Sequence, residues 1–169
     1  MSNAVTLPLL SEAPPGEVTV AGSNLRIVFR RHLRAPVQNV WAALTIPERL
    51  ADWFATATID LRVGGSIHVG WADFRITESD PPRSLAWIWE LGGRDTLVRF
   101  DLVPEADGCL LTLTHSGLDP EGGPGAGVRA GWHAHLEGLP DALEGRMTPR
   151  EIKLAREAAL NEVYPGLPA

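Results

Sequence analysis

The residues most able to do chemistry lie late in the chain, around one histidine. Leu111, Leu113 and His115 alternate along a predicted strand, so His115 faces the same side as two apolar residues. An imidazole in such a setting can orient the polar group of a ligand or act as a general acid or base. It can equally be a buried side chain satisfied by a backbone carbonyl or a neighbouring acid. Ser116 points to the opposite face, so the pair does not form a catalytic triad.

Tryptophan is the second unusual feature, with six tryptophans against one tyrosine. Trp87 and Trp89 are two residues apart on a predicted strand, so both point to one face together with Leu85 and Leu91. If that face is concave, the rings line a hollow that suits a planar or polycyclic guest. Two alternatives stay open: the rings could fill the hollow as core residues, or the face could be convex and exposed.

Metal and phosphate chemistry have little support in the sequence. His133 and His135 are two residues apart on a predicted helix, about 200° apart around its axis, so they cannot share one metal ion. We expect no metal site and no cofactor. The Gly122–Gly125 run lacks the Lys-Ser/Thr pair of a phosphate loop and is interpreted as a flexible hinge. The strand register of His68 is undetermined, so it is either a pocket donor or a solvated residue.

Charge and composition narrow the class of protein. The 169 residues fit one domain with a sizeable core. A formal net charge of −6 argues against a nucleic-acid partner, because no basic excess exists to displace counterions. The only basic cluster, Arg30, Arg31 and Arg34, is interpreted as the solvated face and end of a strand. The chain has a single cysteine, Cys109, no apolar run of membrane length and no basic residue before Val5–Leu10. These features predict a cytoplasmic protein without signal peptide or membrane insertion.

Hydrophobic periodicity predicts two short helices inside a run of strands, followed by a long helix. Val37, Val40, Trp41 and Leu44 form one apolar stripe, and a second short helix follows after Pro47. The predicted antiparallel strands cover residues 25–33, 56–62, 66–71, 74–79, 85–91, 96–103 and 109–115. The long helix covers residues 128–143, and we expect Pro140 to bend or break it.

The two ends of the chain are predicted to lie outside this domain. Residues 1–22 contain several prolines and are interpreted as a flexible arm, and residues 23–146 as the domain itself. Residues 147–169 carry an extra amphipathic helix and tail. Thr148-Pro149-Arg150-Glu151 reads as a capping box with Thr at the N-cap, and Tyr164-Pro165-Gly166 as the stop. This helix could pack on its own domain or on a second protomer.

Several short motifs occur in an order typical of one family. They are Pro47-Glu48-Arg49-Leu50-Ala51-Asp52-Trp53-Phe54, Gly64-Gly65, Asp80-Pro81-Pro82-Arg83-Ser84-Leu85, Trp89, Leu111-Thr112-Leu113-Thr114-His115-Ser116-Gly117-Leu118 and Gly131-Trp132. With these motifs the chain resembles the activator-of-Hsp-ATPase-like branch of the START-related, helix-grip (SRPBCC) superfamily. The resemblance implies an α+β fold, in which a curved antiparallel sheet of about seven strands grips a long C-terminal helix and leaves a cavity. The hairpin around Trp71 looks shorter than is usual in the family, which would reshape one mouth of that cavity.

The resemblance implies three candidate functions. The leading hypothesis is a non-enzymatic module whose internal apolar cavity binds a small hydrophobic molecule, with aromatic compounds among the candidates. The alternatives are a protein-interaction domain that activates a chaperone ATPase, and a cofactor-free polyketide-type cyclase or hydrolase using His115. The candidate cavity residues are Trp41, Trp53, Phe54, His68, Trp71, Phe74, Trp87, Trp89, Phe100, Leu113, His115, Trp132, His135, Leu136 and Leu139.

Overall fold

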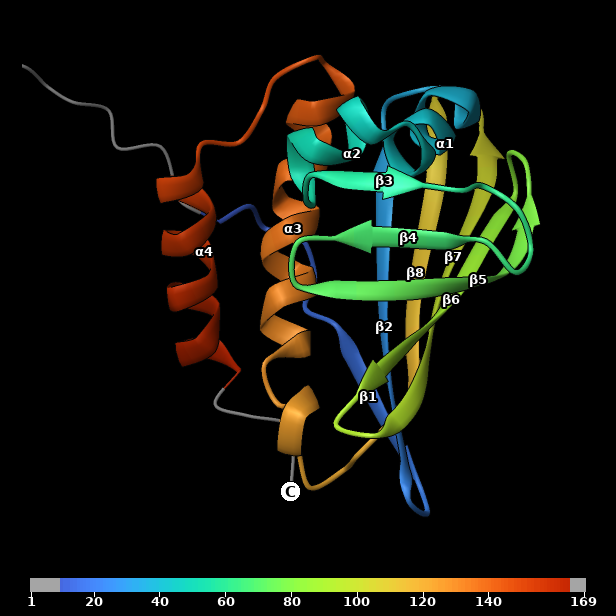
Figure 1. The fold of residues 1–169 in the computed structure, drawn as a ribbon. Coiled ribbons are helices and arrows are strands. Elements are labelled where there is room, and N and C mark those ends of the chain that lie inside the picture. Colours follow the sequence, from blue (N-terminus) through green and yellow to red (C-terminus); the bar gives the residue numbers. More distant parts are fainter. Residues whose placement is uncertain (1–9, 165–169) are drawn as a thin grey trace, which may run out of the picture.

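One curved antiparallel sheet of eight strands wraps around a long helix (Figure 1). The computed structural model describes residues 10–164. The strands are β1 (Glu17–Ala21), β2 (Asn24–Leu33), β3 (Ala57–Ile59), β4 (Ser66–Val69), β5 (Ala72–Asp80), β6 (Ser84–Leu91), β7 (Arg94–Glu105) and β8 (Gly108–Leu118). The helices are α1 (Val37–Thr45), α2 (Pro47–Trp53), the 3-10 turn η1 (Gly123–Gly125), α3 (Val128–Leu143) and α4 (Arg150–Val163).

The sheet order, β1-β2-β8-β7-β6-β5-β4-β3, is a meander from β3 to β8 with the first hairpin added beside β8. Alternate residues of β2 face inward, so Leu25, Ile27 and Phe29 are almost fully buried. Phe29 pairs in register with Leu113 of β8, and Leu113 pairs with Phe100 of β7. The concave face is therefore a continuous apolar surface, and the predicted helix-grip fold is confirmed.

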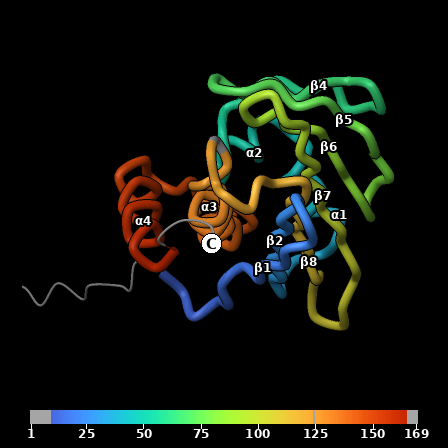
Figure 2. The backbone as a smooth tube through the Cα atoms, turned by 90° about the horizontal axis from the view of Figure 1, so that it is seen from below, coloured from blue at the N-terminus to red at the C-terminus, as the bar shows by residue number. Residues whose placement is uncertain are grey.

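Helices cover the concave face in two layers. Helix α3 lies against the sheet, and α4 lies on the far side of α3, as the view along α3 shows (Figure 2). The short helices α1 and α2 close one end, where the Trp53 indole N–H donates to the Ala43 carbonyl at 2.8 Å. Among residues 10–164, no helix combines the length and apolarity needed to cross a bilayer.

The N-terminal segment differs from the expected arm. Glu17–Ala21 forms the eighth strand, β1, which pairs with β2 from Glu17↔Val28 to Ala21↔Asn24. Val18, Thr19 and Val20 are β-branched and favour an extended backbone, a signal that the preceding prolines obscured. The rest of the expected arm, residues 1–9, lies outside the described residues.

Two expectations about the C-terminal third are wrong in detail. Pro140 does not break α3, which continues to Leu143, since a proline close to the end of a helix disturbs few of its hydrogen bonds; that it bends α3 stays a prediction. Thr148 does not cap α4: the N-cap is Pro149, and no side chain bonds to it. Instead Thr148 is buried against α3, where a Cβ at Gly138 would lie 2.6 Å from its hydroxyl oxygen. The expected stop at Pro165-Gly166 lies outside the described residues.

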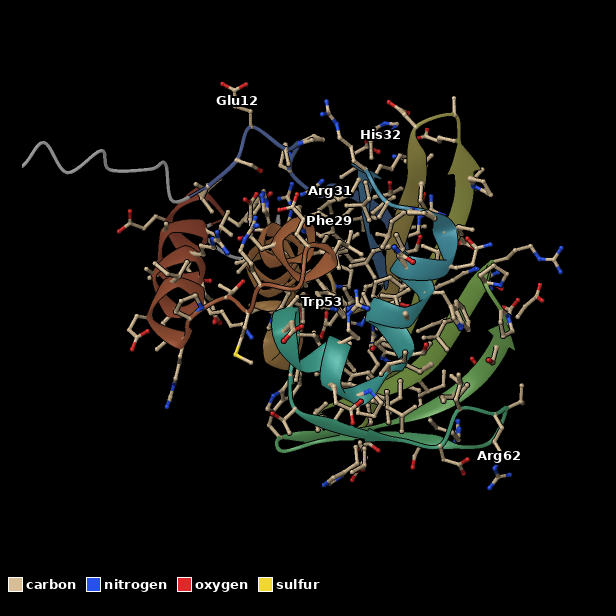
Figure 3. The ribbon with its side chains drawn as sticks, turned by 90° about the horizontal axis from the view of Figure 1, so that it is seen from above. Glu12, Phe29, Arg31, His32, Trp53 and Arg62 are labelled. Carbon is tan, nitrogen blue, oxygen red and sulfur yellow. The ribbon has the colours of Figure 1, made fainter. Side chains whose placement is uncertain are left out.

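The basic cluster on β2 is only partly solvated. Arg31 lies on the inward side of β2 and is buried, although Arg30 and Arg34 are exposed. Figure 3 shows Phe29 and Arg31 on the side of β2 that faces α3, and His32 on the other side. The Arg31 guanidinium lies 5.4 Å from the Phe29 ring centroid, and burial lowers its pKa. Strand alternation places residue 31 with residues 27 and 29, and this signal outweighs the hydrophilic composition.

A buried polar cluster joins β2 and the residue that follows α4 to α3. We call Arg31, His133, Glu137 and Tyr164 the polar clasp. The Tyr164 hydroxyl lies 2.8 Å from His133 Nδ1, and His133 Nε2 lies 3.3 Å from Glu137 Oε1. Burial alone would raise the pKa of Glu137, but hydrogen bonds from His133 and from Ser11 lower it to about 2.

Helix α4 packs on its own domain, which is one of the two arrangements the sequence left open. Ala130 and Ala134 of α3 form a second apolar cluster with Leu160 and Tyr164 of the C-terminal segment. Leu160 is 1% exposed, whereas Leu154 on the same helix is 55% exposed. Leu160, the one buried residue of α4, is therefore its main apolar anchor.

We predict that Leu160→Ala lowers the free energy of unfolding by about 2–4 kcal/mol, because it leaves a cavity between α3 and α4. Leu154→Ala, the matched control on the exposed side, should change it by less than about 0.5 kcal/mol. Urea denaturation followed by circular dichroism measures both values. Equal effects of the two substitutions would mean that α4 is not docked on α3.

Candidate functional site

A chain of buried hydrogen bonds at His115 joins three strands to α3. The Thr96 hydroxyl donates to the Trp89 carbonyl at 2.7 Å, and it lies 2.7 Å from His115 Nε2. Because that hydroxyl proton is already used, Nε2–H of His115 is the donor to Thr96. His115 Nδ1 then accepts the indole N–H of Trp132 at 3.1 Å. Both nitrogens of this fully buried imidazole are thus occupied.

Aromatic rings fill most of the space between the sheet and α3. Phe74 stacks on Trp87 with ring centroids 5.3 Å apart, and Trp87 contacts Phe100 at 5.4 Å. Phe100 in turn packs edge-on against Trp53 and Trp132. These side chains are at most 3% exposed, so they form a core and do not line an internal hollow.

A pocket of about 400 Å³ remains where this aromatic core reaches the surface. We call its four aromatic walls, Phe54, Trp71, Trp89 and Trp132, the aromatic box. Its rings contact one another in a closed circuit, with centroid separations of 6.0 Å (54–71), 5.6 Å (71–89), 6.4 Å (89–132) and 5.4 Å (132–54). The remaining lining residues are Leu91, Gly127, Val128, Gly131, His135 and Glu157.

Separate elements supply the walls of the box. Phe54 follows α2, Trp71 lies in the turn between β4 and β5, and Trp89 lies on β6. Trp132 is on the first two turns of α3, where Gly131 leaves the helix surface open: a Cβ there would meet nothing within 4 Å. The box therefore depends on the sheet curving far enough to bring β4–β6 against α3.

Two titratable side chains reach the pocket. The imidazole of His135 lies 4.9 Å from the Phe54 ring, and its Nδ1–H donates to the Trp53 carbonyl at 3.3 Å. Burial lowers the pKa of His135 to about 4, helped by the positive charge of Lys153 and opposed by the bond to Trp53. His135 is therefore neutral at pH 7 and leaves Nε2 as an acceptor. Glu157 is the second group; it comes from α4 and is exposed.

The predicted cavity residues separate into three groups. Phe54, Trp71, Trp89, Trp132 and His135 line the pocket. Two lie away from it: Trp41 is half-buried at the edge of the core, and His68 is exposed on the outer face beside Asp73. The others are buried in the core: Trp53, Phe74, Trp87, Phe100, Leu113, His115, Leu136 and Leu139.

The structure also describes the face of Trp87 and Trp89, the partners of His115 and the grouping of potential metal ligands. Trp87 and Trp89 both face the concave side, so one ring fills the core and the other lines the pocket. His115 is satisfied by the hydroxyl of Thr96 and the indole of Trp132, where a carbonyl or an acid was expected. In the described part of the chain, no three His, Cys, Asp or Glu side chains are grouped as metal ligands would be.

Sequence reasoning missed five lining residues, Leu91, Gly127, Val128, Gly131 and Glu157. Gly131 carried a usable signal, since a glycine beside a tryptophan inside an amphipathic helix indicates a surface that something else approaches. Glu157 carried none, because its place depends on how α4 docks.

Comparison with known proteins gives the family. Residues 34–144 match the family model of the Activator of Hsp90 ATPase homolog 1-like proteins (AHSA1), which covers more than half of the chain. The chain belongs to the AHSA1 family. The matched part begins just after β2 and ends just after α3, so β1, β2 and α4 lie outside it. No curated protein gives a significant match.

Solved structures agree with this assignment. The crystal structure of CalU16 from Micromonospora echinospora is 31% identical, covering 89% of this AHSA1-family chain and 94% of CalU16, with a TM-score of 0.67. DynU16, from the dynemicin biosynthetic locus, is 28% identical over 72% of this chain and 48% of its own, with a TM-score of 0.65. The BPP1335 protein of Bordetella parapertussis, at 24% identity, covers 95% of this chain and 94% of its own with a TM-score of 0.68, and shows the fold alone.

We predict that Thr96→Val lowers the free energy of unfolding by about 1–3 kcal/mol, because it keeps the side-chain shape but leaves the His115 N–H and the Trp89 carbonyl without their buried partner. Thr114→Val, on the outer face of β8, is the matched control and should have little effect. Urea denaturation measures the two changes. If the Thr96→Val protein were as stable as the control, the hydrogen-bond chain would not contribute to the stability of the fold.

The buried histidines also predict a pH dependence. Burial lowers the pKa of His115 to about 3 and that of His135 to about 4. Below about pH 6.5 these two histidines are protonated in the unfolded chain but stay neutral in the folded protein. Because the unfolded state then binds more protons, the free energy of unfolding falls as the pH falls, by up to about 1.4 kcal/mol per pH unit for each histidine. Urea denaturation between about pH 7.5 and about pH 5 should show this slope. His135→Gln should reduce it, and an unfolding free energy that is constant over this range would contradict the assignment.

Proposed function

We propose that this AHSA1-family protein binds a small aromatic or polycyclic molecule in the aromatic box and does no chemistry on it. The observation that carries the proposal is the pocket of about 400 Å³ whose four ring walls come from separate parts of the fold. Its volume lies in the usual range for small-molecule sites, about 300–1,000 Å³. Flat aromatic walls favour a planar guest through stacking and edge contacts.

The aromatic box lies at the surface, so the binding we propose differs from binding in the enclosed cavity that the sequence predicted. The sequence predicted an enclosed cavity, and the space where that cavity was expected is occupied by Trp53, Phe74, Trp87 and Phe100. The guest we propose therefore inserts between Trp71 and Trp132 from the outside. Trp71 is 56% exposed, so a bound ring would bury apolar surface that the free protein leaves in water.

Binding is better supported than catalysis. A cyclase or hydrolase of the kind considered above needs His115 as acid or base, but both of its nitrogens are engaged and no pocket-lining residue is a serine or cysteine nucleophile. The likeness to DynU16, a protein of the dynemicin biosynthetic locus, also fits a chain that handles a small organic molecule. We place the protein in the cytoplasm, where the buried thiol of Cys109 stays reduced.

The proposal predicts saturable 1:1 binding of 1-naphthalenemethanol, a neutral bicyclic probe, measured by isothermal titration calorimetry. Gly131→Leu should abolish it, because the added side chain enters open space inside the pocket and leaves the helix intact. Trp71→Ala should weaken it by about tenfold through loss of one wall. Native mass spectrometry of freshly purified protein should show a small-molecule adduct that Gly131→Leu lacks.

Two control variants make this test specific. Gly131→Ala adds only a methyl group and should leave most of the affinity, and Trp41→Ala removes a tryptophan remote from the box and should leave all of it. Wild-type protein with no adduct and no heat of binding would contradict the proposed function. Equal losses in Trp41→Ala and Trp71→Ala would move the site away from the box.

A further inference from the structure

The aromatic box has one charged group at its rim, and this sets which guests it should prefer. Glu157 is the only acidic side chain among the residues that line the pocket, and no lysine or arginine lines it. Glu157 reaches the pocket from α4, which lies outside the region that matches the AHSA1 family model. The feature is therefore a property of this chain and not of the matched region.

The rings themselves favour positive charge. The face of an indole or phenyl ring is the negative end of its quadrupole, and a cation within about 6 Å of the ring centroid is attracted to it, most strongly by tryptophan. Three of the four rings of the box are tryptophans. In the part of the chain that the structure describes, the two cations over aromatic rings are Arg31 on Phe29 and Arg129 on Tyr164, and neither lines the box.

The attraction of the rings for a cation must be compared with the effect of the charges near the pocket. Lys153 lies one turn before Glu157 on α4, and its positive charge acts on His135. The carboxylate of Asp52 acts on Lys153 in turn, and Lys153 is not among the lining residues. Lys153 therefore has an acidic neighbour of its own, whereas no hydrogen bond or ion pair of Glu157 is seen within the described residues.

The start of α3 offers the opposite preference. Gly127 and Val128 line the pocket at the N-terminus of this helix, where backbone N–H groups carry roughly half a positive charge and would attract a carboxylate. Against that half charge stand the carboxylate of Glu157 and the faces of three tryptophans, each of which attracts a cation. The acceptor Nε2 of His135 acts in the same direction as Glu157, because it too calls for a donor on the guest.

We propose that the guest of the aromatic box carries a protonated amino group, which lies against the tryptophan faces and pairs with the carboxylate of Glu157. This inference rests on the proposed function and names the ligand class: an aromatic ammonium compound. The apolar ring of the guest fills the box, and its N–H groups donate to Glu157 and to Nε2 of His135.

Three probes with one ring system test the inference by calorimetry at about pH 7. They are 1-naphthylmethylamine, which is a cation at this pH, 1-naphthalenemethanol, which is neutral, and 1-naphthylacetate, which is an anion. We expect the amine to bind about tenfold more tightly than the alcohol, and the acetate to bind more weakly than both. The preference for the amine should shrink as salt is added, because Glu157 is exposed.

Glu157→Gln keeps the size of the side chain and removes its charge. This variant should lose most of the preference for the amine while binding the alcohol as the wild type does. Glu162→Gln, an exposed carboxylate of α4 outside the pocket lining, is the matched control and should keep the preference.

The outcomes separate this inference from the function on which it rests. Equal affinities for amine and alcohol in the wild type, or an amine preference that Glu157→Gln retains, would overturn the inference and leave aromatic binding standing. Tightest binding of the acetate would assign selectivity to the start of α3 and overturn the inference as well. Failure of all three probes to bind would overturn the proposed function together with the inference.

Discussion

The arrangement of the site depends on one buried hydrogen-bond chain, from the Trp132 indole through His115 and Thr96 to the Trp89 carbonyl. It ties β6, β7 and β8 to α3 at the point where the sheet would otherwise be held by apolar contacts alone. Apolar contacts are non-directional, whereas this chain fixes the register of α3 against the sheet. The ring of Trp89 also stacks on His115, with centroids 5.4 Å apart. Two of the four walls of the aromatic box are therefore positioned by a single neutral imidazole.

This constraint explains why some tryptophans fill the core and others line the pocket. A sheet curved around a helix leaves more volume than aliphatic side chains fill, and large rings close that volume at about 150–250 Å² of buried surface each. Trp87 and Trp132 are each 3% exposed and close the space from within. Toward the β4–β5 turn the packing is open, because Trp71 lies at the surface there. Filling the interior stabilises the fold, and the open space is left at the surface, where the aromatic box lies.

Much of this was predictable from local pattern. Period-two alternation fixed the strands from β2 to β8, and the motifs around Trp53, His115 and Trp132 indicated the family. The inward direction of Trp89 and His115 followed once the sheet was assumed to be curved. Rings that fill the core could not be told from rings that line the pocket. Trp87 and Trp89 have the same pattern in sequence, and only the structure shows that Trp87 fills the core and Trp89 lines the pocket. Glu157 escaped prediction for a related reason: its environment is made by α4, whose docking no local pattern encodes. Arg31 was predictable from the alternation of β2, but its hydrophilic neighbours obscured that signal.

The segments outside the matched region therefore affect the site through geometry. The polar clasp joins Arg31 of β2, His133 and Glu137 of α3 and Tyr164 after α4, and the backbone N–H of Gly16 donates to the Tyr164 hydroxyl at 3.2 Å. Buried charged groups of this kind contribute little net stability, because desolvation offsets their attraction, but they penalise alternative placements that leave a charge unpaired. Apolar packing at Leu160 alone would let α4 slide along α3. The clasp opposes that sliding, and the position of Glu157 at the rim of the box therefore depends on residues at both ends of α4 and on β2.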